Sequence, residues 1–345
     1  MSDLLRWGII GSGYIAGQFA NGVNHSKHCK MLAVASPTLS KANTFADEFN
    51  IPNRYGSYDQ LLADPNVDAV HIATPHTLHQ EWAIKAAKAG KHVLCEKPVG
   101  LNSSQAQAII QAARENNVFF MEAYMYRMHP QIAHVLKLIQ SDAIGELRFI
   151  QASFSYNEPD AAPDGLLRNN ALGGGGILDV GGYPLTLARL LAGSTKTTAS
   201  INPTQIKAVG IISETHVDEY TTASLEFPNG ILAQITAGIS VDMDNQVRIF
   251  GSKGSITILD PWTPACEGGS VQIILKNGDD EKTIDITTDQ YLYGIEADTC
   301  AKTIAAGKQQ ANAPAMNWED TIGTITTQDQ WRKQIGLTYQ ADTPN

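Results

Sequence analysis

The chain has 345 residues, 43% hydrophobic and 17% charged, a composition that excludes a disordered chain, a fibrous repeat and a small disulfide-held protein. At about 150 residues per domain, this length predicts two domains. The formal net charge of −10, from 25 Lys and Arg against 35 Asp and Glu, argues against nucleic acid or an anionic membrane surface as a partner.

Cysteine usage and the amino terminus indicate the compartment. Cys29, Cys95, Cys266 and Cys300 have neither metal-ligand nor disulfide spacing, which is typical of reduced thiols in a cytoplasmic protein. No apolar run reaches the roughly 18 residues of a membrane span. Glycines interrupt the first residues, where a signal peptide needs a continuous apolar stretch. We therefore expect a cytoplasmic protein.

Short β-rich runs alternate with amphipathic segments over residues 1–125. The predicted strands are Leu5–Ile10, Met31–Ala35, Ala69–Ile72, His92–Cys95 and Phe119–Glu122. The predicted helices are Tyr14–Val23, Leu39–Phe49, Leu78–Ala89 and Ser103–Asn116. This alternation predicts an α/β domain with a parallel sheet covered by helices on both faces.

The pattern changes after about residue 126. The predicted helices there are Gln131–Gln140, Ile177–Leu191, Gln290–Ala306 and Trp318–Ile335. Glu146–Ser155 is a predicted strand, and most of Ala199–Ile286 is predicted strand with hairpin turns. Residues 126–345 are therefore expected to form an α+β domain on a large, mostly antiparallel sheet with one open face. The last helix is expected to pack back on the first domain.

The first strand runs into a glycine loop and then a helix. The order is that of the G-x-G-x-x-A fingerprint: a tight turn, close approach of the backbone to a pyrophosphate, and close helix packing at Ala16. The helix start offers free N–H groups to phosphates. A simple glycine turn is the alternative, but the βα units that follow favour a dinucleotide. The predicted cofactor contacts in the loop are Gly11, Ser12, Gly13, Tyr14 and Ile15.

The end of the second strand distinguishes the two nicotinamide dinucleotides. An NAD site normally has an acid there for the ribose 2′-hydroxyl. This chain has Ser36, followed by Thr38 and Lys41, and no carboxylate before Asp47. Hydroxyls and a lysine suit a 2′-phosphate, which predicts NADP, with NAD still possible. Thr38 or Ser40 also suits a helix cap, and the two roles are compatible.

The third predicted strand ends in a polar segment. Ligands bind at the carboxyl ends of strands in open α/β sheets, so we predict cofactor contacts from Thr74, Pro75, His76 and His79. Packing at the helix start is the alternative for the histidines. A metal site would need a third ligand that the sequence does not offer, and we expect no metal.

Glu96, Lys97 and Pro98 follow the next predicted strand. A lysine at this edge reaches toward a nicotinamide, and a cis bond at Pro98 would aim it. A surface lysine in a turn is the alternative. We take Glu96 and Lys97 as cofactor-binding candidates and Lys97 also as a catalytic candidate.

A run of four glycines opens a helix in the second domain. Asp179 and Tyr183, four residues apart, share one face of it. A carboxylate and a phenol together suit proton transfer in an alcohol–carbonyl interconversion. The alternative is that Asp179 caps the helix and Tyr183 belongs to the core.

In this order, GSGYIA, TPHTLH, EKP and GGGGILDVGGYPL resemble the motifs of the Gfo/Idh/MocA oxidoreductase family. EAYMYRMHP, at 122–130, is similar to the segment of its dihydrodiol dehydrogenase and NADP-dependent D-xylose dehydrogenase branch. MNWED, before the last helix, extends the resemblance over nearly the whole chain. It implies a Rossmann domain followed by a domain with a large open-faced sheet.

The resemblance also implies roles. Lys97 matches the lysine beside the nicotinamide, and Asp179 and Tyr183 match the D-x-x-x-[H/Y] pair. Arg127 would lie near the cofactor or substrate. Pro37 departs from the family, because many NADP-using members have arginine there. His76, where asparagine is common, is a second departure.

The implied activity is hydride transfer between a nicotinamide and a hydroxyl or carbonyl carbon of a sugar, polyol or cyclic trans-dihydrodiol. Tyr183 would be the general acid or base, with the Lys97 ammonium lowering its pKa and Asp179 orienting lysine or substrate. Three alternatives are an NAD-dependent redox glycosidase, a glucose–fructose-type enzyme that keeps its cofactor bound, and a non-catalytic sugar- or dinucleotide-sensing regulator on the same fold.

One predicted strand suggests the oligomeric state. Apolar residues recur at a two-residue spacing, and we expect them on the open face of the sheet. They are Ile231, Ala233, Ile235, Ala237 and Ile239. An exposed apolar face of this size normally marks an interface, which predicts a homodimer joined around a two-fold axis.

Overall fold

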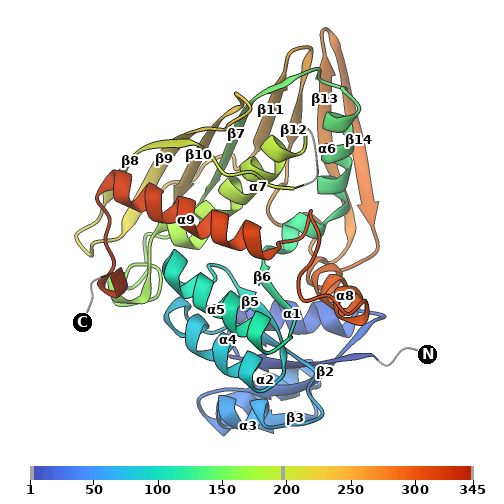
Figure 1. The fold of residues 1–345 in the computed structure, drawn as a ribbon, viewed down its shortest axis with the longest axis vertical. Helices are drawn as coiled ribbons and strands as arrows, with labels where there is room; N and C mark the ends of the chain where they lie inside the picture. The colour runs from blue at the N-terminus through green and yellow to red at the C-terminus, as the bar shows by residue number, and fades with distance from the viewer. Residues whose placement is uncertain (1–3, 196–198, 343–345) are drawn as a thin grey trace.

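The computed structural model describes residues 4–195 and 199–342, which build two sheets with their helices (Figure 1). The first sheet is parallel and has the strand order β3-β2-β1-β4-β5-β6. Its strands are β1 Leu5–Ile10, β2 Cys29–Ala35, β3 Asn53–Tyr55, β4 Ala69–Ile72, β5 His92–Glu96 and β6 Phe120–Ala123. This is the doubly wound α/β arrangement that the alternation of elements predicts.

Helices connect these strands. They are α1 Tyr14–Asn24, α2 Leu39–Phe49, α3 Tyr58–Leu62, α4 His79–Lys88 and α5 Ser103–Glu115. The sequence analysis missed β3 and α3, which span only 3 and 5 residues. β3 has no apolar alternation and exists as an edge strand because it pairs with β2.

The second sheet is eight-stranded, in the order β14-β13-β12-β11-β7-β10-β9-β8. Its strands are β7 Leu147–Ser155, β8 Gln205–Ile212, β9 Asp218–Glu226, β10 Leu232–Gly238, β11 Val247–Gly251, β12 Gly254–Ile258, β13 Gly269–Asn277 and β14 Asp280–Thr288. Neighbours run antiparallel, apart from β7 and β10, which are parallel. The predicted large, mostly antiparallel sheet is confirmed.

Helices cover one face of this sheet (Figure 1). They include α6 Pro130–Gln140, a π-helical turn at Ile177–Gly181 that continues into α7 Gly182–Gly193, and α9 Trp318–Ile335. The remaining helix, α8 Leu292–Ala305, lies beside the first domain. α7 packs on β7 and β10, and α8 packs on α1. α9 contacts α5 of the first sheet, where Asp329 accepts a hydrogen bond from the backbone N–H of Ser103 (2.9 Å). None of the described helices is long and apolar enough to cross a membrane.

The expected face of β10 is wrong. All five residues of the apolar set, Ile231 to Ile239 at every second position, are buried under the helices. Leu232, in contrast, is 47% exposed, and Gln234 is exposed on the open face. Side chains alternate in a strand, so a one-residue error in assignment exchanges the two faces. The purely apolar set forms the core, and the mixed set faces outward.

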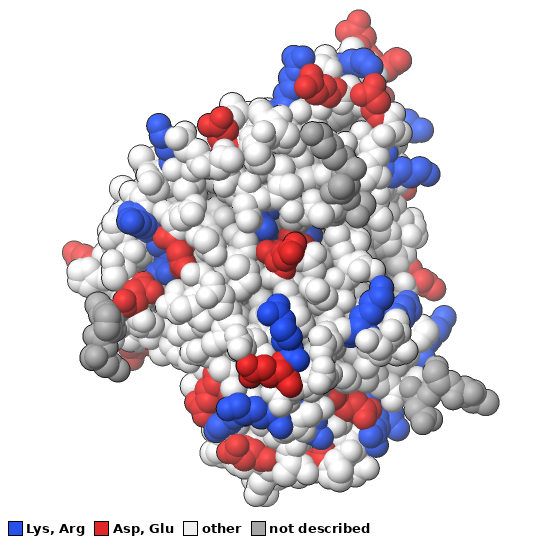
Figure 2. All heavy atoms as spheres, in the orientation of Figure 1, with Lys and Arg blue, Asp and Glu red and all other residues white. Residues whose placement is uncertain are grey.

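Figure 2 shows acidic and basic side chains interspersed over the face of the molecule that is seen in Figure 1.

One buried acid stands out among the helices. Glu296 of α8 is fully buried, and neither of its carboxyl oxygens has a hydrogen-bond partner among the described residues. Burial, and then the nearby charge of Glu96, raise the pKa of Glu296 well above its usual value. The folded protein therefore favours the protonated form of Glu296 more strongly than the unfolded chain does.

Replacing Glu296 with Gln should stabilise the protein at high pH but not at low pH. The unfolded chain releases this proton above a pKa of about 4.3, while the folded chain keeps it, so the free energy of unfolding falls as the pH rises above that value. The side-chain amide of Gln does not titrate, so the variant does not lose stability in this way as the pH rises. In urea titrations, we expect the advantage of Glu296→Gln to grow by more than about 1.4 kcal/mol, the worth of one pKa unit, between about pH 4.5 and about pH 8. An advantage independent of pH would contradict this.

Candidate active site

The glycine loop after β1 has the backbone of a phosphate-binding turn. Gly11 has φ +106°, and a Cβ there would lie 2.5 Å from the carbonyl oxygen of Ala73, so only glycine fits. Gly13, the N-cap of α1, faces open space, because a Cβ there would meet no atom within 4 Å. No side chain caps α1 at this residue, which leaves the first N–H groups of the helix available to an anion. The loop therefore fits a pyrophosphate.

A cleft of about 900 Å³ opens in front of this loop and runs along the carboxyl edge of the first sheet. It brings together most of the predicted site residues from both halves of the chain. Those that line it are Gly11, Ser12, Gly13, Tyr14, Ile15, Ser36, Lys41, Thr74, Pro75, His76, His79, Glu96, Lys97, Asp179 and Tyr183. Thr38 and Arg127 are not among its lining residues.

One end of the cleft is rich in hydroxyl groups. The Oγ atoms of Ser12 and Ser36 lie 2.9 Å apart, and Ser40 and Lys41 of α2 line the same end. Thr38 caps α2 instead, because its side chain accepts a hydrogen bond from the backbone N–H of Lys41 (3.3 Å). The capping alternative therefore accounts for Thr38.

At the other end, two side chains share the carboxylate of Asp179. Lys97, which follows β5, donates from Nζ to the backbone oxygen (2.7 Å) and to Oδ1 (3.2 Å) of Asp179. The hydroxyl of Tyr156 donates to Oδ2 (2.5 Å). Burial opposes the charge of Asp179, but Lys97 and Tyr156 outweigh it and hold the pKa of this carboxyl below its usual value. Asp179 is therefore an anion that orients the lysine.

Tyr183 lies beside this group, but its hydroxyl does not meet Lys97. Nζ of Lys97 is 5.5 Å from the centroid of the ring, and the hydroxyl points to Sδ of Met125 (3.8 Å). Burial, and then the neighbouring Tyr293 and Glu96, raise the pKa of Tyr183 well above 10. The expectation that Lys97 lowers this pKa is wrong, because the ammonium is directed to Asp179. Tyr183 is a neutral phenol.

The two predicted histidines have different surroundings. His76 lines the cleft, and burial, followed by the charges of His79 and Lys97, lowers its pKa to about 3. His76 is therefore neutral. His79 is fully buried, and its ring nitrogens each lie 2.8 Å from a carbonyl oxygen, that of Pro98 and that of Thr74. It joins the loops after β4 and β5 at the cleft. Among the described residues there is no group of three potential metal ligands.

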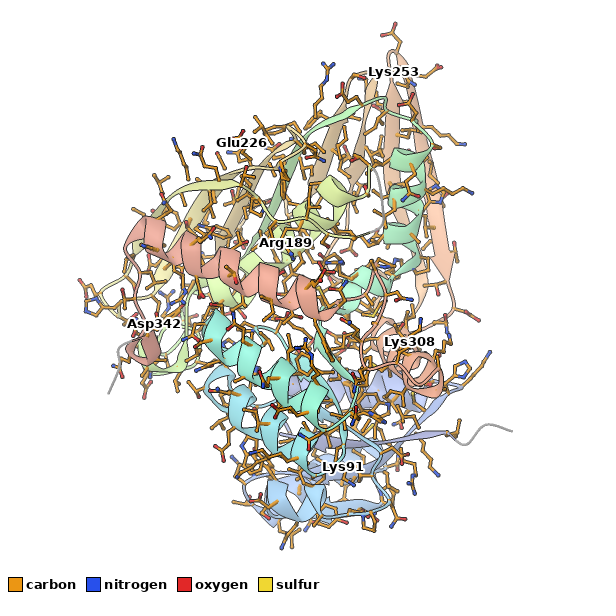
Figure 3. The ribbon with its side chains drawn as sticks, viewed as in Figure 1. Lys91, Arg189, Glu226, Lys253, Lys308 and Asp342 are labelled. Atoms are coloured by element: carbon orange, nitrogen blue, oxygen red, sulfur yellow. The ribbon has the colours of Figure 1, made fainter. Side chains whose placement is uncertain are left out.

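Arg127 does not reach the cleft, and the expected cofactor contact is wrong in this structure. Its guanidinium is fully buried, donates to the carbonyl of Pro314 (2.7 Å) and lies 3.4 Å from Asp320. Arg189 pairs with the same Asp320, also at 3.4 Å. Figure 3 shows Arg189 in the interior, where α7 and α9 meet. The two arginines hold the start of α9 in the protein core.

Sequence reasoning missed Tyr156, which carries no motif of its own. A smaller cavity of about 240 Å³ adjoins Asp179 and is lined by Tyr156, Glu158, Leu166 and His76 among others. Tyr156, Glu158 and Leu166 come from the loop after β7, whose path follows from no local signal. A helix cap or a hairpin can be found from sequence, whereas a hydroxyl that meets a carboxylate 23 residues away cannot.

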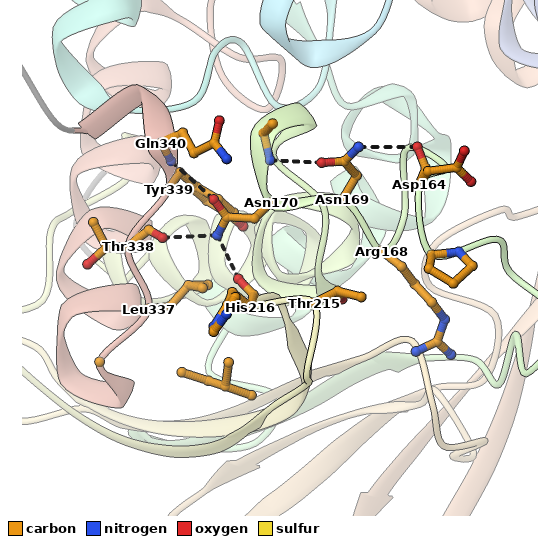
Figure 4. Close-up of a pocket in the computed structure, with 14 residues that line it drawn as sticks. Asp164, Arg168, Asn169, Asn170, Thr215, His216, Leu337, Thr338, Tyr339 and Gln340 are labelled. Atoms are coloured by element: carbon orange, nitrogen blue, oxygen red, sulfur yellow. Dashed lines mark hydrogen bonds between the residues drawn. The ribbon is translucent and has the colours of Figure 1, made fainter. Parts of the chain in front are cut away.

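A separate cavity of about 770 Å³ lies behind this loop (Figure 4). There Asn170 donates to the carbonyl oxygens of His216 (2.6 Å) and Thr338 (3.0 Å). Its side-chain oxygen accepts from the backbone N–H of Gln340 (3.1 Å). The loop that lines the smaller cavity is thus tied to the carboxyl-terminal segment.

The phosphate-binding turn, the cleft and the Lys97–Asp179 pair define a dinucleotide-binding oxidoreductase. Two family models match: "Oxidoreductase family, NAD-binding Rossmann fold" over residues 5–124 and "GFO/IDH/MocA C-terminal domain" over residues 132–257. The chain belongs to the Gfo/Idh/MocA oxidoreductase family, and the sequence-based identification is confirmed.

Named relatives agree with this assignment. The chain is 37% identical over 263 residues to trans-1,2-dihydrobenzene-1,2-diol dehydrogenase of Mus musculus, covering 75% of this chain and 76% of that one. It is 31% identical to the same enzyme of Sus scrofa over 352 residues, covering 98% and 99%.

Among solved structures, the chain is similar to a 3-ketoreductase from Actinomadura kijaniata in complex with NADP and TDP-benzene, with 27% identity, a TM-score of 0.85 and coverage of 96% and 98%. It is also similar to an aldose-aldose oxidoreductase from Caulobacter crescentus, with 25% identity, a TM-score of 0.85 and coverage of 96% and 97%.

Proposed function

We propose that the protein is an NADP-dependent dehydrogenase or reductase that acts on a CH–OH or carbonyl carbon of a sugar, polyol or cyclic trans-dihydrodiol. The observation that carries the proposal is the group formed by Lys97, Asp179, Tyr156 and Tyr183 in a cleft that begins at the glycine loop. The relatives are named as a diol dehydrogenase, a 3-ketoreductase and an aldose-aldose oxidoreductase, and these names support the same substrate classes.

The chain's own residues would handle the proton. When bound, the nicotinamide supplies or takes up the hydride. Tyr183, a neutral phenol lining the cleft, is the donor that a substrate oxygen needs when a carbonyl is reduced. Lys97, held by Asp179, places positive charge where that oxygen becomes negative. Asp179, held by Tyr156, orients the lysine, and both residues would also bind hydroxyl groups of the substrate.

The proposal is tested by following NADPH or NADP⁺ absorbance with aldoses, deoxysugar ketones and trans-dihydrodiols. Turnover with a member of this panel supports a dehydrogenase or reductase. Tight dinucleotide binding with no turnover of any substrate would favour the sensing regulator instead. Glycoside hydrolysis would favour the redox glycosidase.

The preference for NADP rests on the hydroxyl-rich end of the cleft. Ser36, Ser40 and Lys41 line the position where a ribose-binding acid would repel a 2′-phosphate. Glu48, more than two turns along α2 from Ser40, also borders the cleft. The related 3-ketoreductase was solved with NADP, which supports the same choice here.

Ser36→Asp should shift the preference toward NAD. A carboxylate at the end of β2 would accept hydrogen bonds from the ribose hydroxyls and repel a 2′-phosphate. We expect kcat/KM for NADP to fall by about 10²-fold relative to that for NAD, since like charges in contact cost several kcal/mol. Ser141→Asp, on an exposed residue after α6, adds the same charge as a control and should leave the ratio unchanged. A parent protein that prefers NAD would refute the proposal.

Tyr183→Phe and Lys97→Met should each lower kcat by about 10²–10⁴, the worth of a positioned acid–base group. Tyr156→Phe keeps the Lys97–Asp179 pair and loses one hydrogen bond, so we expect a smaller loss, of about tenfold. Fluorescence titration with NADPH should show unchanged cofactor affinity in Tyr183→Phe. Near-full turnover of Tyr183→Phe would assign the proton to another group.

We also propose a homodimer through the open face of the second sheet, with the face corrected as above. Large apolar side chains there are between 37% and 71% exposed, and the rings of Phe149 and Phe250 lie 6.2 Å apart on this face. The exposed apolar side chains on this face are Val209, Ile211, Tyr220, Leu232 and Phe250. A second copy related by a two-fold axis would cover these side chains.

We also propose a cytoplasmic location, which the four free cysteine thiols support.

Light scattering at micromolar concentration should give twice the 37.2 kDa mass of the chain. Leu232→Glu places a charge within the apolar open face, where a second copy would bury it, and should shift the particle toward the monomer. Leu4→Glu, at a residue that is 41% exposed away from this sheet, is the matched control and should stay dimeric. A parent protein that scatters as a monomer would disprove the dimer.

A further inference from the structure

The turn that carries Asp179 and Tyr183 is held from behind by side chains that do not line the cleft. Asp218, at the start of β9, accepts a hydrogen bond at Oδ2 from the backbone N–H of Ile177 (2.7 Å). Gln328 of α9 donates to the carbonyl of the same residue (2.8 Å). Both backbone polar groups of Ile177, two residues before Asp179, are therefore fixed by distant parts of the chain.

The glycine run is shaped around Asp218. Gly175 has φ +107°, and a Cβ there would collide with Oδ1 of Asp218. A Cβ at Gly176 would lie 3.1 Å from the backbone of Gly238 and 3.3 Å from Oδ2 of Asp218. Gly175 and Gly176 thus let the backbone of the turn pack directly against this carboxylate, where a side chain would not fit.

Asp218 is an unusual choice for a residue that only packs. Its side chain is fully buried, and Oδ1 has no hydrogen-bond partner among the described residues. Burial raises its pKa to about 7, while the N–H groups of Ile177 and Gly176 and the charge of Arg332 oppose the rise. A buried acid with one unsatisfied oxygen costs stability, and such violations concentrate at functional sites.

The position of Asp218 also suits its charge. The turn at Ile177–Gly181 runs directly into α7, so Asp218 lies at the amino-terminal end of a continuous helical segment that ends at Gly193. A carboxylate is stabilising there, because the N–H groups of the first turn point toward it. The hydrogen bond is charge-assisted when Asp218 is ionised, which makes it stronger and more directional than a neutral one.

We propose that Asp218 is a positioning residue: it fixes the turn at Ile177 so that Asp179 meets Lys97 and Tyr156 and Tyr183 faces the cleft. This role rests on the proposed function of the same site. Asp179 reaches Lys97 at 2.7 and 3.2 Å, and a displacement of about 1 Å would break these contacts. A misplacement of about that size, caused away from the chemistry, can cost 10²-fold in rate.

The test compares Asp218→Ala and Asp218→Asn with the parent protein. We expect kcat of the folded protein to fall by about 10²-fold in Asp218→Ala, because the N–H of Ile177 loses its acceptor. Asp218→Asn keeps an oxygen acceptor without the charge and should recover most of this loss, leaving about a tenfold deficit. KM for NADPH and the affinity for NADPH should stay unchanged in both variants, since the glycine loop is untouched.

Asp64→Asn and Asp64→Ala are matched controls. Asp64 is also a buried acid that accepts from a backbone N–H, that of Asn66 (2.8 Å), but it precedes β4, at the edge of the sheet opposite the cleft. Its variants should lose stability without losing kcat. Amide hydrogen exchange gives a second readout, and residues 176–183 should exchange about tenfold faster in Asp218→Ala but not in Asp64→Ala.

The outcomes separate the two hypotheses. A parent protein without turnover would overturn the proposed function, and the exchange rates of 176–183 would then decide on Asp218 alone. If Asp218→Ala does not fold, Asp218→Asn decides, with the tenfold loss of kcat at constant affinity for NADPH as support. A kcat within twofold of the parent, or an unchanged exchange rate where no turnover exists, would overturn the positioning role.

Discussion

The site depends on one ion pair between the two halves of the chain. Lys97 comes from the loop after β5 of the first sheet, and Asp179 comes from the turn before α7 of the second half, 82 residues later. The pair is partly buried, and such pairs gain little net stability, because desolvation of the two charges offsets their attraction, but their hydrogen bonds fix the geometry. The cleft takes its shape from this requirement: the edge of the Rossmann sheet and the α7 turn must stay within hydrogen-bond distance of each other.

Within each half, a buried carboxyl group supports the backbone beside its member of the pair. Glu122 of β6 accepts a hydrogen bond from the backbone N–H of Val99 (2.9 Å), two residues after Lys97. Asp218 does the same for Ile177, two residues before Asp179. Burial, the largest cause, raises the pKa of each acid to about 7. Both members of the ion pair are thus carried by backbone that a buried carboxyl group holds from the far side.

Local sequence signals predicted the elements and the loops, but not the contacts between them. The strands of the first sheet, the hairpins of the second and the glycine loop follow from periodicity, turn residues and spacing. Tyr156 and Asp218 could not be found this way, because each acts through a partner that is distant in sequence. Arg127 was misplaced because a basic residue beside a motif gives no sign of the buried Asp320 that pairs with it. The face of β10 failed for a related reason: both of its faces carry apolar residues, and only packing decides between them.

In the proposed reaction, Lys97 would supply positive charge and Tyr183 would supply the proton, and the two residues have different surroundings. On one side Asp179 holds the ammonium group, and Tyr156 donates a hydrogen bond to the same carboxylate. On the other side, an aromatic shell encloses Tyr183, with the rings of Tyr124, Phe154 and Trp262 between 5.0 and 6.0 Å from its own. The aromatic shell disfavours a phenolate, so the proton stays on Tyr183 until a more basic oxygen lies within reach. An alkoxide formed from a carbonyl is such an oxygen, whereas an alcohol is not. In the proposed reaction, the two environments therefore favour proton donation by Tyr183 to the oxygen of a carbonyl substrate. In the reverse direction the proton of the alcohol would have to go to a Tyr183 phenolate, which these surroundings disfavour.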